Sequence, residues 1–472
     1  MGNSEEYPYS TETRLTPRSR GDVVPITFQQ RWELISIRDK RRSHAAMGRA
    51  LRLTGTLDVD ILRASLDTLF RRHEALRTRI SIVDGCPRQE IEDACKCNLE
   101  TLSVTGGTEG RIEAEAHRLA TEFVYEPVDL TVGPLFKARL LRMSDHEHVL
   151  ALAKDHIISD GVSIRILLRE VETLYTGLAQ GVSPSLLNIP IQYGDYAVWQ
   201  KKTDNAWKRN HAKYWQERLS QATRIQLPVD AGITKFAPFS YATAKIRVGK
   251  QLSLQLRDLA RRRKTTLAMI IFTVYVSLVS RFCNATDLVV PFLAMGRDLP
   301  ILGNTVGFFA HCLYLRIELA KNDTFLDVLR CVNMELNAAS RHTDSGRMME
   351  LMPEFLVGGT FHWDPWGNPD FGNRRIAHVT DTNESHRGGL EIKPFPLNRP
   401  TFDAADFKIH ADIGWTFKDG VEGIVGNGGY RADLFNGSTI KQFIKNFLSF
   451  AKRFLGDPHA RISAVPVEGK AP

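Results

Sequence analysis

The most constraining feature of the chain is an apolar run, a polar break and an amphipathic stretch in direct succession. Residues 149–153 are uniformly apolar, which predicts a buried strand. The polar break runs from Lys154 to Gly161. Apolar side chains then recur at helical spacing, namely Ile164, Leu167, Leu168, Val171, Leu174 and Tyr175. The pattern predicts a strand that leads through a polar turn into a helix lying on a sheet.

Further segments of both kinds occur along the chain. Asp58 is a plausible N-cap for a helix whose apolar face runs from Ile61 to Phe70. Residues 288–293 and 313–319 predict strands, and residues 193–219 and 440–455 predict helices. Strands and helices mix without a strict β-α-β alternation, which predicts an α/β fold in two lobes.

The length and composition place the chain among ordinary globular proteins. It has 472 residues, of which 43% are hydrophobic and 25% charged. These values exclude a mostly disordered, collagen-like or coiled-coil chain, and the length suffices to bury a core without disulfides. We expect a flexible tail over residues 1–21, an N-terminal lobe over 22–185 and a C-terminal lobe over 186–472.

The charge and the cysteine content indicate which partners and which cellular compartment to expect. The net charge of +8 attracts anions, so the partner could be nucleic acid, anionic lipid, an acidic protein or a phosphorylated ligand. No aromatic and basic stripe typical of nucleic-acid binding is present. The six cysteines lack paired zinc-ribbon spacing, and the polar N-terminus lacks the apolar core of a secretion signal. The longest apolar run, 267–279, is too short for a membrane span. We expect a cytoplasmic protein with reduced thiols and no membrane or nucleic-acid partner.

The polar break carries the residues best suited to chemistry. An imidazole such as that of His156 can take a proton from an attacking amine or hydroxyl. A backbone N–H near a helix start, with Gly161 allowing close approach, can stabilise an oxyanion. Taken alone, His156 also fits a structural histidine and Asp160 a helix N-cap. A metal site of His146, His148 and His156 is a further alternative, but no carboxylate stands at a convincing spacing.

Residues 156–161, His-Ile-Ile-Ser-Asp-Gly, resemble the H-x-x-x-D-G core of the condensation domains of nonribosomal peptide synthetases. That family belongs to the superfamily of chloramphenicol acetyltransferase. Six other segments resemble signatures of the same family in the same order: 71–78 (R-R-H-E-A-L-R-T), 192–200 (Q-Y-G-D-Y-A-V-W-Q), 214–219 (Y-W-Q-E-R-L), 295–297 (M-G-R), 306–316 (with V-G-F-F) and 430–435 (Y-R-A-D-L-F). The resemblance extends from about residue 25 to residue 467.

The resemblance implies an architecture and a reaction. Two chloramphenicol-acetyltransferase-like lobes would form a V-shaped pseudo-dimer around a central substrate tunnel, with His156 near its middle. An acyl or aminoacyl thioester would enter on the phosphopantetheine of a carrier protein. An amine or alcohol, small or carrier-bound, would attack it to give an amide or ester. No metal or redox cofactor is implied.

The same resemblance implies roles for five residues. His156 matches the active-site histidine, and Gly161 matches the glycine whose backbone lies along the thioester. Asp160 matches a structural aspartate, and Arg297 its ion-pair partner. Asp155 stands where peptide-forming members carry a first histidine, a position that supports the loop.

Two departures keep alternatives open. Asp155, Asp160 and Ser163 also fit the D-x-x-x-x-D-x-x-S signature of the heterocyclization subfamily, although His156 and Gly161 favour simple condensation. His311 stands where the family commonly has asparagine, which bears on acceptor contacts. Epimerization, acyl transfer from coenzyme A, or a catalytically silent module that recruits a partner to a carrier-bound peptide are further alternatives.

The chain contains no segment resembling an adenylation or carrier domain. We therefore expect a free-standing, monomeric condensation enzyme that meets its carrier protein in trans. Carrier proteins are generally acidic, so a basic surface would aid their encounter.

Overall fold

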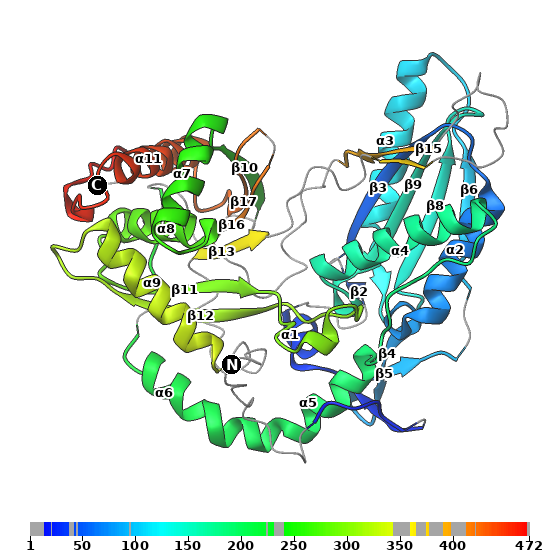
Figure 1. Cartoon of the computed structure of the whole chain (residues 1–472), viewed down its shortest axis with the longest axis horizontal. Helices are drawn as coiled ribbons and strands as arrows, with labels where there is room; N and C mark the ends of the chain where they lie inside the picture. The colour runs from blue at the N-terminus through cyan, green and yellow to red at the C-terminus, as the bar shows by residue number, and fades with distance from the viewer. Residues whose placement is uncertain are drawn as a thin grey trace. The chain divides into compact units, whose positions relative to one another are not determined.

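The computed structural model describes residues 14–19, 21–36, 42–43, 46–93, 96–222, 225–230, 240–342, 359–364, 374–376, 390–397, 412–420 and 422–469. These residues fall into two compact units (Figure 1). The first unit lies within Met1–Lys208, Arg297–Ala310 and Asp370–Pro400. The second lies within Arg209–Gly296, His311–Pro369 and Thr401–Pro472.

The first unit is built on a six-stranded sheet with the order β14-β15-β3-β9-β8-β6. Its strands are β3 (Ala46–Thr54), β6 (Leu99–Ser103), β8 (Phe136–Arg142), β9 (Glu147–Asp155), β14 (Arg374–Ile376) and β15 (Leu390–Phe395). All neighbouring strands are antiparallel except β6 and β8. The central strand β9 contains the run predicted over 149–153, and it is buried along almost its whole length.

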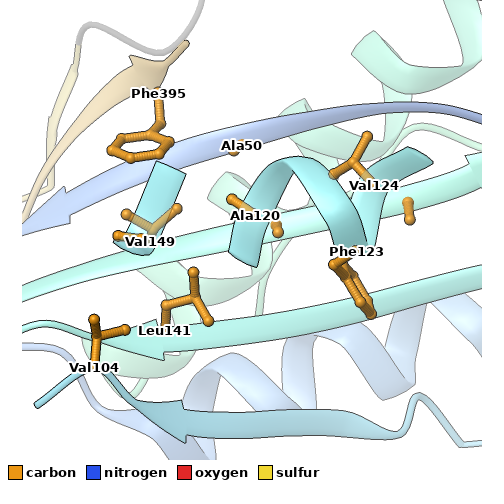
Figure 2. Packing of buried hydrophobic residues seen from close by; sticks show 11 residues of the cluster. Ala50, Val104, Ala120, Phe123, Val124, Leu141, Val149 and Phe395 are labelled. Carbon is orange, nitrogen blue, oxygen red and sulfur yellow. The ribbon is translucent and has the colours of Figure 1, made fainter. Parts of the chain in front are cut away.

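Helix α3 (Glu109–Tyr125) covers one face of this sheet. Its small residues Ala116 and Ala120 let it approach closely, and Phe123 fills the space beside them. Figure 2 shows Ala120 and Phe123 over β9 and its neighbours, together with Phe395 of β15. The odd-numbered residues of β9 face this helix because side chains alternate along a strand.

The even-numbered residues of β9 face the other side, where α2 (Val59–Arg72) packs on the sheet. Phe70 of α2 meets Phe136 of β8 edge to face, with ring centroids 5.6 Å apart. Phe136 lies directly opposite Lys154 of β9 in the ladder. Asp58 caps α2, as predicted, by accepting hydrogen bonds from the Asp60 and Ile61 amides. Helix α4 (Gly161–Ala179) packs against α2.

The remaining elements of the first unit frame the end of β9. They are β1 (Val24–Pro25), α1 (Phe28–Ser36), β2 (Arg42–Ser43), β4 (Thr78–Val83), β5 (Cys86–Ile91), β7 (Val128–Asp129) and α5 (Tyr193–Trp207). Strands β1, β5 and β4 form a small antiparallel sheet, and β2 pairs with β7. Helix α1 packs near the turn that follows β9, and α5 packs on β1.

The second unit has its own six-stranded sheet with the order β10-β17-β16-β13-β11-β12. The elements of this unit are α6 (Lys213–Leu219), β10 (Tyr241–Arg247), α7 (Lys250–Arg262), α8 (Leu267–Cys283), β11 (Asp287–Ala294), β12 (His311–Glu318), α9 (Phe325–Ser340), β13 (Gly359–Asp364), β16 (Ile413–Lys418), β17 (Val425–Arg431) and α11 (Gly437–Gly456). The predicted strands 288–293 and 313–319 correspond to β11 and β12. The apolar run 267–279 forms α8, which is buried almost throughout.

The mixed α/β class expected from the sequence is confirmed, whereas the division into units differs from the expected lobes. The first unit extends past residue 185 because α5 packs on β1 and because two later segments return to it. One of these segments supplies β15, which pairs with β3. The V-shaped arrangement and the tunnel stay predictions.

The end of the expected flexible tail is packed rather than free. Leu15 is buried, and the Arg18 guanidinium forms ion pairs with Glu74 and Asp195, both at 2.8 Å. Residues 1–13 lie outside the described residues. Among the described helices, none is by itself both long and apolar enough to cross a membrane. The adjoining pair α7 and α8 meets those criteria only when taken together, with a bend of 106° between them.

Candidate active site

The site is built on the turn between β9 and α4. The strand ends at Asp155, a short 3-10 turn covers His156–Ile158, and α4 begins at Gly161. Asp155 Oδ1 accepts a hydrogen bond from the Ile157 amide at 2.9 Å and caps the turn. Asp160 caps α4 in the same way, accepting from the Ser163 amide at 2.9 Å. Both short carboxylates thus satisfy backbone donors that the turn leaves open.

The surroundings of His156 favour its neutral form. Its ring packs against that of Phe308, with centroids 4.2 Å apart, and the side chain is only partly exposed. Burial, together with the positive charge of Lys154, lowers the pKa of His156 to about 4. The Nδ1 atom is buried and has no hydrogen-bond partner among the described residues. At neutral pH the imidazole therefore carries no charge and can accept a proton.

The ion pair expected between Asp160 and Arg297 is present and almost fully buried. Arg297 approaches the carboxylate with two nitrogens, Nη1 to Oδ2 at 2.7 Å and Nη2 to Oδ1 at 3.0 Å. The guanidinium also lies 4.5 Å above the ring of Phe309. Burial by itself raises the pKa of Asp160, but Arg297 and the hydrogen bonds from Ser163 outweigh it, so the pKa is lowered. Asp160 therefore stays a carboxylate at neutral pH.

Asp160 and Ser163 also fix the Gly307–Phe309 segment beside the turn. The Phe309 amide donates to Asp160 Oδ2 at 3.1 Å, and the Gly307 amide donates to Ser163 Oγ at 3.1 Å. The Ser163 hydroxyl lies 2.8 Å from both Asp160 Oδ1 and the Gly307 carbonyl oxygen, and can donate to either. One carboxylate and one hydroxyl therefore hold the helix start, Arg297 and this segment together.

A second layer of buried polar side chains supports the site from α1 and α5. Gln30 Nε2 donates to the Ile157 carbonyl oxygen at 3.0 Å. Tyr193 Oη donates to the Phe308 carbonyl oxygen at 2.6 Å and lies 2.8 Å from Thr27 Oγ1. Sequence analysis did not single out Gln30 or Thr27, since one buried glutamine or threonine carries no periodic signal.

The two glycines of the site serve different needs. A Cβ on Gly307 would lie 2.1 Å from the Tyr193 ring, so packing requires glycine there. A Cβ on Gly161 would meet no atom of the described residues within 4 Å, and the backbone of Gly161 is not left-handed. Neither packing nor backbone conformation therefore explains Gly161. A side chain at Gly161 would therefore extend into open space at the start of α4.

Lys154 is a further component that sequence analysis did not identify. The side chain is 2% exposed, and its Nζ donates to Ser159 Oγ and lies 3.5 Å from the Asp160 carbonyl oxygen. A lysine at a strand end is normally solvated, so its sequence position gives no sign of burial.

The R-H-E signature anchors α4 to α2. His73 Nε2 lies 2.8 Å from Glu170 Oε2 of α4, and Arg72 Nε donates to the same oxygen at 3.0 Å. Glu170 and His73 are both buried. These bonds connect α4, which carries Asp160 and Gly161 at its first turn, to the preceding helix.

The geometry does not support a metal site in this region. His146 precedes β9 and His156 follows it, and nine residues of strand separate their neighbours by roughly 25–30 Å. The alternative ligand set His146, His148 and His156 is therefore wrong. No group of three or more potential ligands gathers elsewhere in the described part of the chain.

Two residues named as departures take defined places. Asp155 caps the turn of His156, which fits its expected role as support for the loop. His311 is buried at the start of β12 in the second unit, opposite Ala294 of β11.

Comparison with known proteins places the chain among condensation domains. The model of the condensation domain family matches residues 20–349. One component of the linear gramicidin synthase of Brevibacillus parabrevis is 28% identical over 461 residues, which are 97% of this chain and 9% of that protein. Enniatin synthase of Fusarium equiseti is 27% identical over 98% of this chain and 14% of its own length. The chain thus spans about a tenth of the length of these relatives.

Solved structures show the same fold. The X-domain in its complex with OxyB from teicoplanin biosynthesis matches with a TM-score of 0.77 at 22% identity, over 97% of this chain and 99% of that one. The first condensation domain of the calcium-dependent antibiotic synthetase matches with a TM-score of 0.73 at 17% identity, over 96% and 100% of the two chains.

Proposed function

Because the chain belongs to the condensation domain family, we propose that it transfers an acyl or aminoacyl group from a carrier-protein phosphopantetheine thioester to an amine or hydroxyl. The product is an amide or ester of natural-product biosynthesis. The observation that carries this proposal is the neutral imidazole of His156. His156 stands in the turn between β9 and α4, which a buried Asp160–Arg297 pair holds in place.

In the proposed reaction the nucleophile attacks the thioester carbonyl carbon while His156 accepts the proton that the nucleophile loses. The carbonyl oxygen becomes an oxyanion, which the positive end of α4 favours. When the intermediate collapses, the carbon–sulfur bond breaks and the carrier thiolate leaves, taking up a proton. The thioester is already activated, so the reaction needs no metal or redox cofactor.

The site favours condensation over heterocyclization. Asp155, Asp160 and Ser163 fit the cyclization signature, but each is engaged in holding backbone: Asp155 the turn, and Asp160 with Ser163 the segment Gly307–Phe309. His156 and Gly161 are retained beside them. The simplest use of this arrangement is one proton transfer and one acyl transfer.

The proposal includes the setting of the reaction. An acidic carrier protein is the expected partner, and the net charge of +8 would speed their encounter at low salt. We propose a monomeric protein of the cytoplasm that acts on a carrier protein, with no nucleic-acid or membrane partner.

The test mixes the protein with an acyl-loaded carrier protein and a pool of amines and alcohols. The intact mass of the carrier and the masses of small products are followed together. We expect wild type to unload the carrier into a new amide or ester. His156→Ala should be about 10²–10⁴-fold slower, as expected for loss of a general base.

Other outcomes assign a different function. A carrier that binds but stays loaded across the pool would support a recruitment module instead. A product lighter by one further water would indicate heterocyclization, and transfer from acyl-coenzyme A alone would indicate a coenzyme A-dependent enzyme.

A further inference from the structure

Two adjacent residues of β9 hold the two ends of the turn that carries His156. Asp155 Oδ1 accepts from the Ile157 amide, where the turn begins. Lys154 Nζ donates to Ser159 Oγ, where the turn ends. We infer that Lys154 is a positioning residue for His156, forming with Asp155 a charged bracket that fixes the turn from the strand side. The consequence of this bracket for the reaction rests on the proposed function.

Packing alone does not explain a lysine at this position. The side chain is 2% exposed and stands opposite Phe136, a residue buried against α2. A buried ammonium is costly unless hydrogen bonds and opposite charges compensate it. Methionine would fill the same place without that cost. The charge therefore needs another explanation, and the groups that Lys154 reaches, Ser159 and Asp160, both belong to the turn.

The surroundings of Lys154 bring its pKa close to neutral pH but leave the side chain protonated. Burial lowers the pKa of Lys154 to about 8, while Asp160 and Asp155 act to raise it and Arg49 and Arg297 to lower it. At pH 7 the ammonium form still dominates.

His156 and Asp155 both interact electrostatically with Lys154. After burial, Lys154 is the main cause of the low pKa of His156, and Asp160 acts in the opposite direction. On the α1 side stands Glu33, whose pKa is raised to about 8 by burial and by the charge of Asp155. Lys154 thus holds the turn in place and disfavours the imidazolium form of His156.

The first experiment measures His156 without any substrate. Carbethoxylation of His156 by diethyl pyrocarbonate, read by peptide mass spectrometry, reports the neutral fraction of the imidazole from pH 7.5 to 5. Wild type should react at a nearly constant intrinsic rate over this range. In Lys154→Met the pKa of His156 should rise, so the rate at pH 5 should fall to about half its value at pH 7 or lower. Lys154→Arg keeps the charge and should follow wild type.

The second experiment measures the reaction. Lys154→Met should slow single-turnover carrier unloading about 10–100-fold while carrier binding stays unchanged, because misplacement of a catalytic group acts on the chemical step. Ser159→Ala, which keeps the lysine and removes its acceptor, should show a smaller loss. Arg63→Met, on the exposed side of α2, is the matched control and should behave as wild type.

An unchanged labelling profile together with an unchanged single-turnover rate in Lys154→Met would overturn the inference. The labelling arm needs no acyl transfer, so a shifted profile in an inactive protein would refute the proposed function and leave the bracket standing. If Lys154→Met does not fold, Ser159→Ala decides. Faster deuterium uptake over residues 155–163 would support the bracket, and unchanged uptake would refute it.

Discussion

At the scale of single residues, the surroundings of His156 set its protonation state. Burial and the charge of Lys154 depress the pKa of His156, while Arg297 keeps Asp160 ionised next to it. A base that stays neutral down to about pH 4 is available for proton transfer at any physiological pH. The same depressed pKa links the site to the pH dependence of folding.

Replacement of His156 by glutamine should therefore flatten the acid side of the stability profile. The imidazole has a pKa of about 4 in the folded chain against a model value of 6.5. As pH falls from 6.5 toward 4 the unfolded state binds the proton first, so this residue lowers the free energy of unfolding by about 3 kcal/mol. Urea unfolding of both proteins at pH 6.5 and pH 4.5 tests this. Equal losses in the two would contradict the assigned pKa.

The buried ion pair between Asp160 and Arg297 should contribute strongly to the stability of the fold. Asp160→Asn leaves the Arg297 guanidinium buried without its counter-charge, which should lower the free energy of unfolding by about 3–5 kcal/mol. Arg297→Lys keeps a positive charge beside Asp160, so it should lower the free energy of unfolding by less than Asp160→Asn does. It should still be less stable than wild type, because one ammonium cannot bind both carboxylate oxygens. Chemical denaturation at pH 7 measures both variants. A loss below about 1 kcal/mol in Asp160→Asn would show that the pair does not hold the site.

At the scale of helices and strands, short-range sequence patterns predicted the features that depend on neighbouring residues, such as helix caps. Asp58 caps α2 and Asp160 caps α4 because short acceptors satisfy the open amides of a helix start. The association of the segment Gly307–Phe309 with the turn involves partners 144 and 149 residues apart, and the sequence did not predict it. The bracket formed by Lys154 was missed because sequence gives no sign that this lysine is buried.

Two glycine substitutions separate packing from function within these elements. Gly307→Ala places a methyl group against the Tyr193 ring and should cost about 1–3 kcal/mol of stability. Gly161→Ala enters open space and should leave stability unchanged or raised by about 0.5 kcal/mol. We expect Gly161→Ala to lose acyl-transfer activity all the same, because in the proposed reaction the thioester lies along the backbone of Gly161, where the added methyl group would obstruct it. Melting curves and unloading rates of the pair test this, and a destabilised Gly161→Ala would contradict it.

At the scale of the whole molecule, two units each carry a six-stranded sheet, and the polar residues described around His156 all belong to the first. The sequence predicted the mixed α/β class but not the unit boundaries. Sequence patterns report on residues that are close together along the chain. The segments 297–310 and 370–400 belong to the first unit through contacts with residues distant in sequence. Arg297 reaches Asp160 only through such a return.

The most direct test of the central claim is the single-turnover rate of carrier unloading in wild type and His156→Gln at pH 7. His146→Gln is the control, because it alters an exposed histidine just before β9, at the end of that strand far from the turn. We expect a loss of about 10²–10⁴-fold in His156→Gln alone, with folding and carrier binding intact. Unloading by His156→Gln at the wild-type rate would contradict the assignment of His156 as the base.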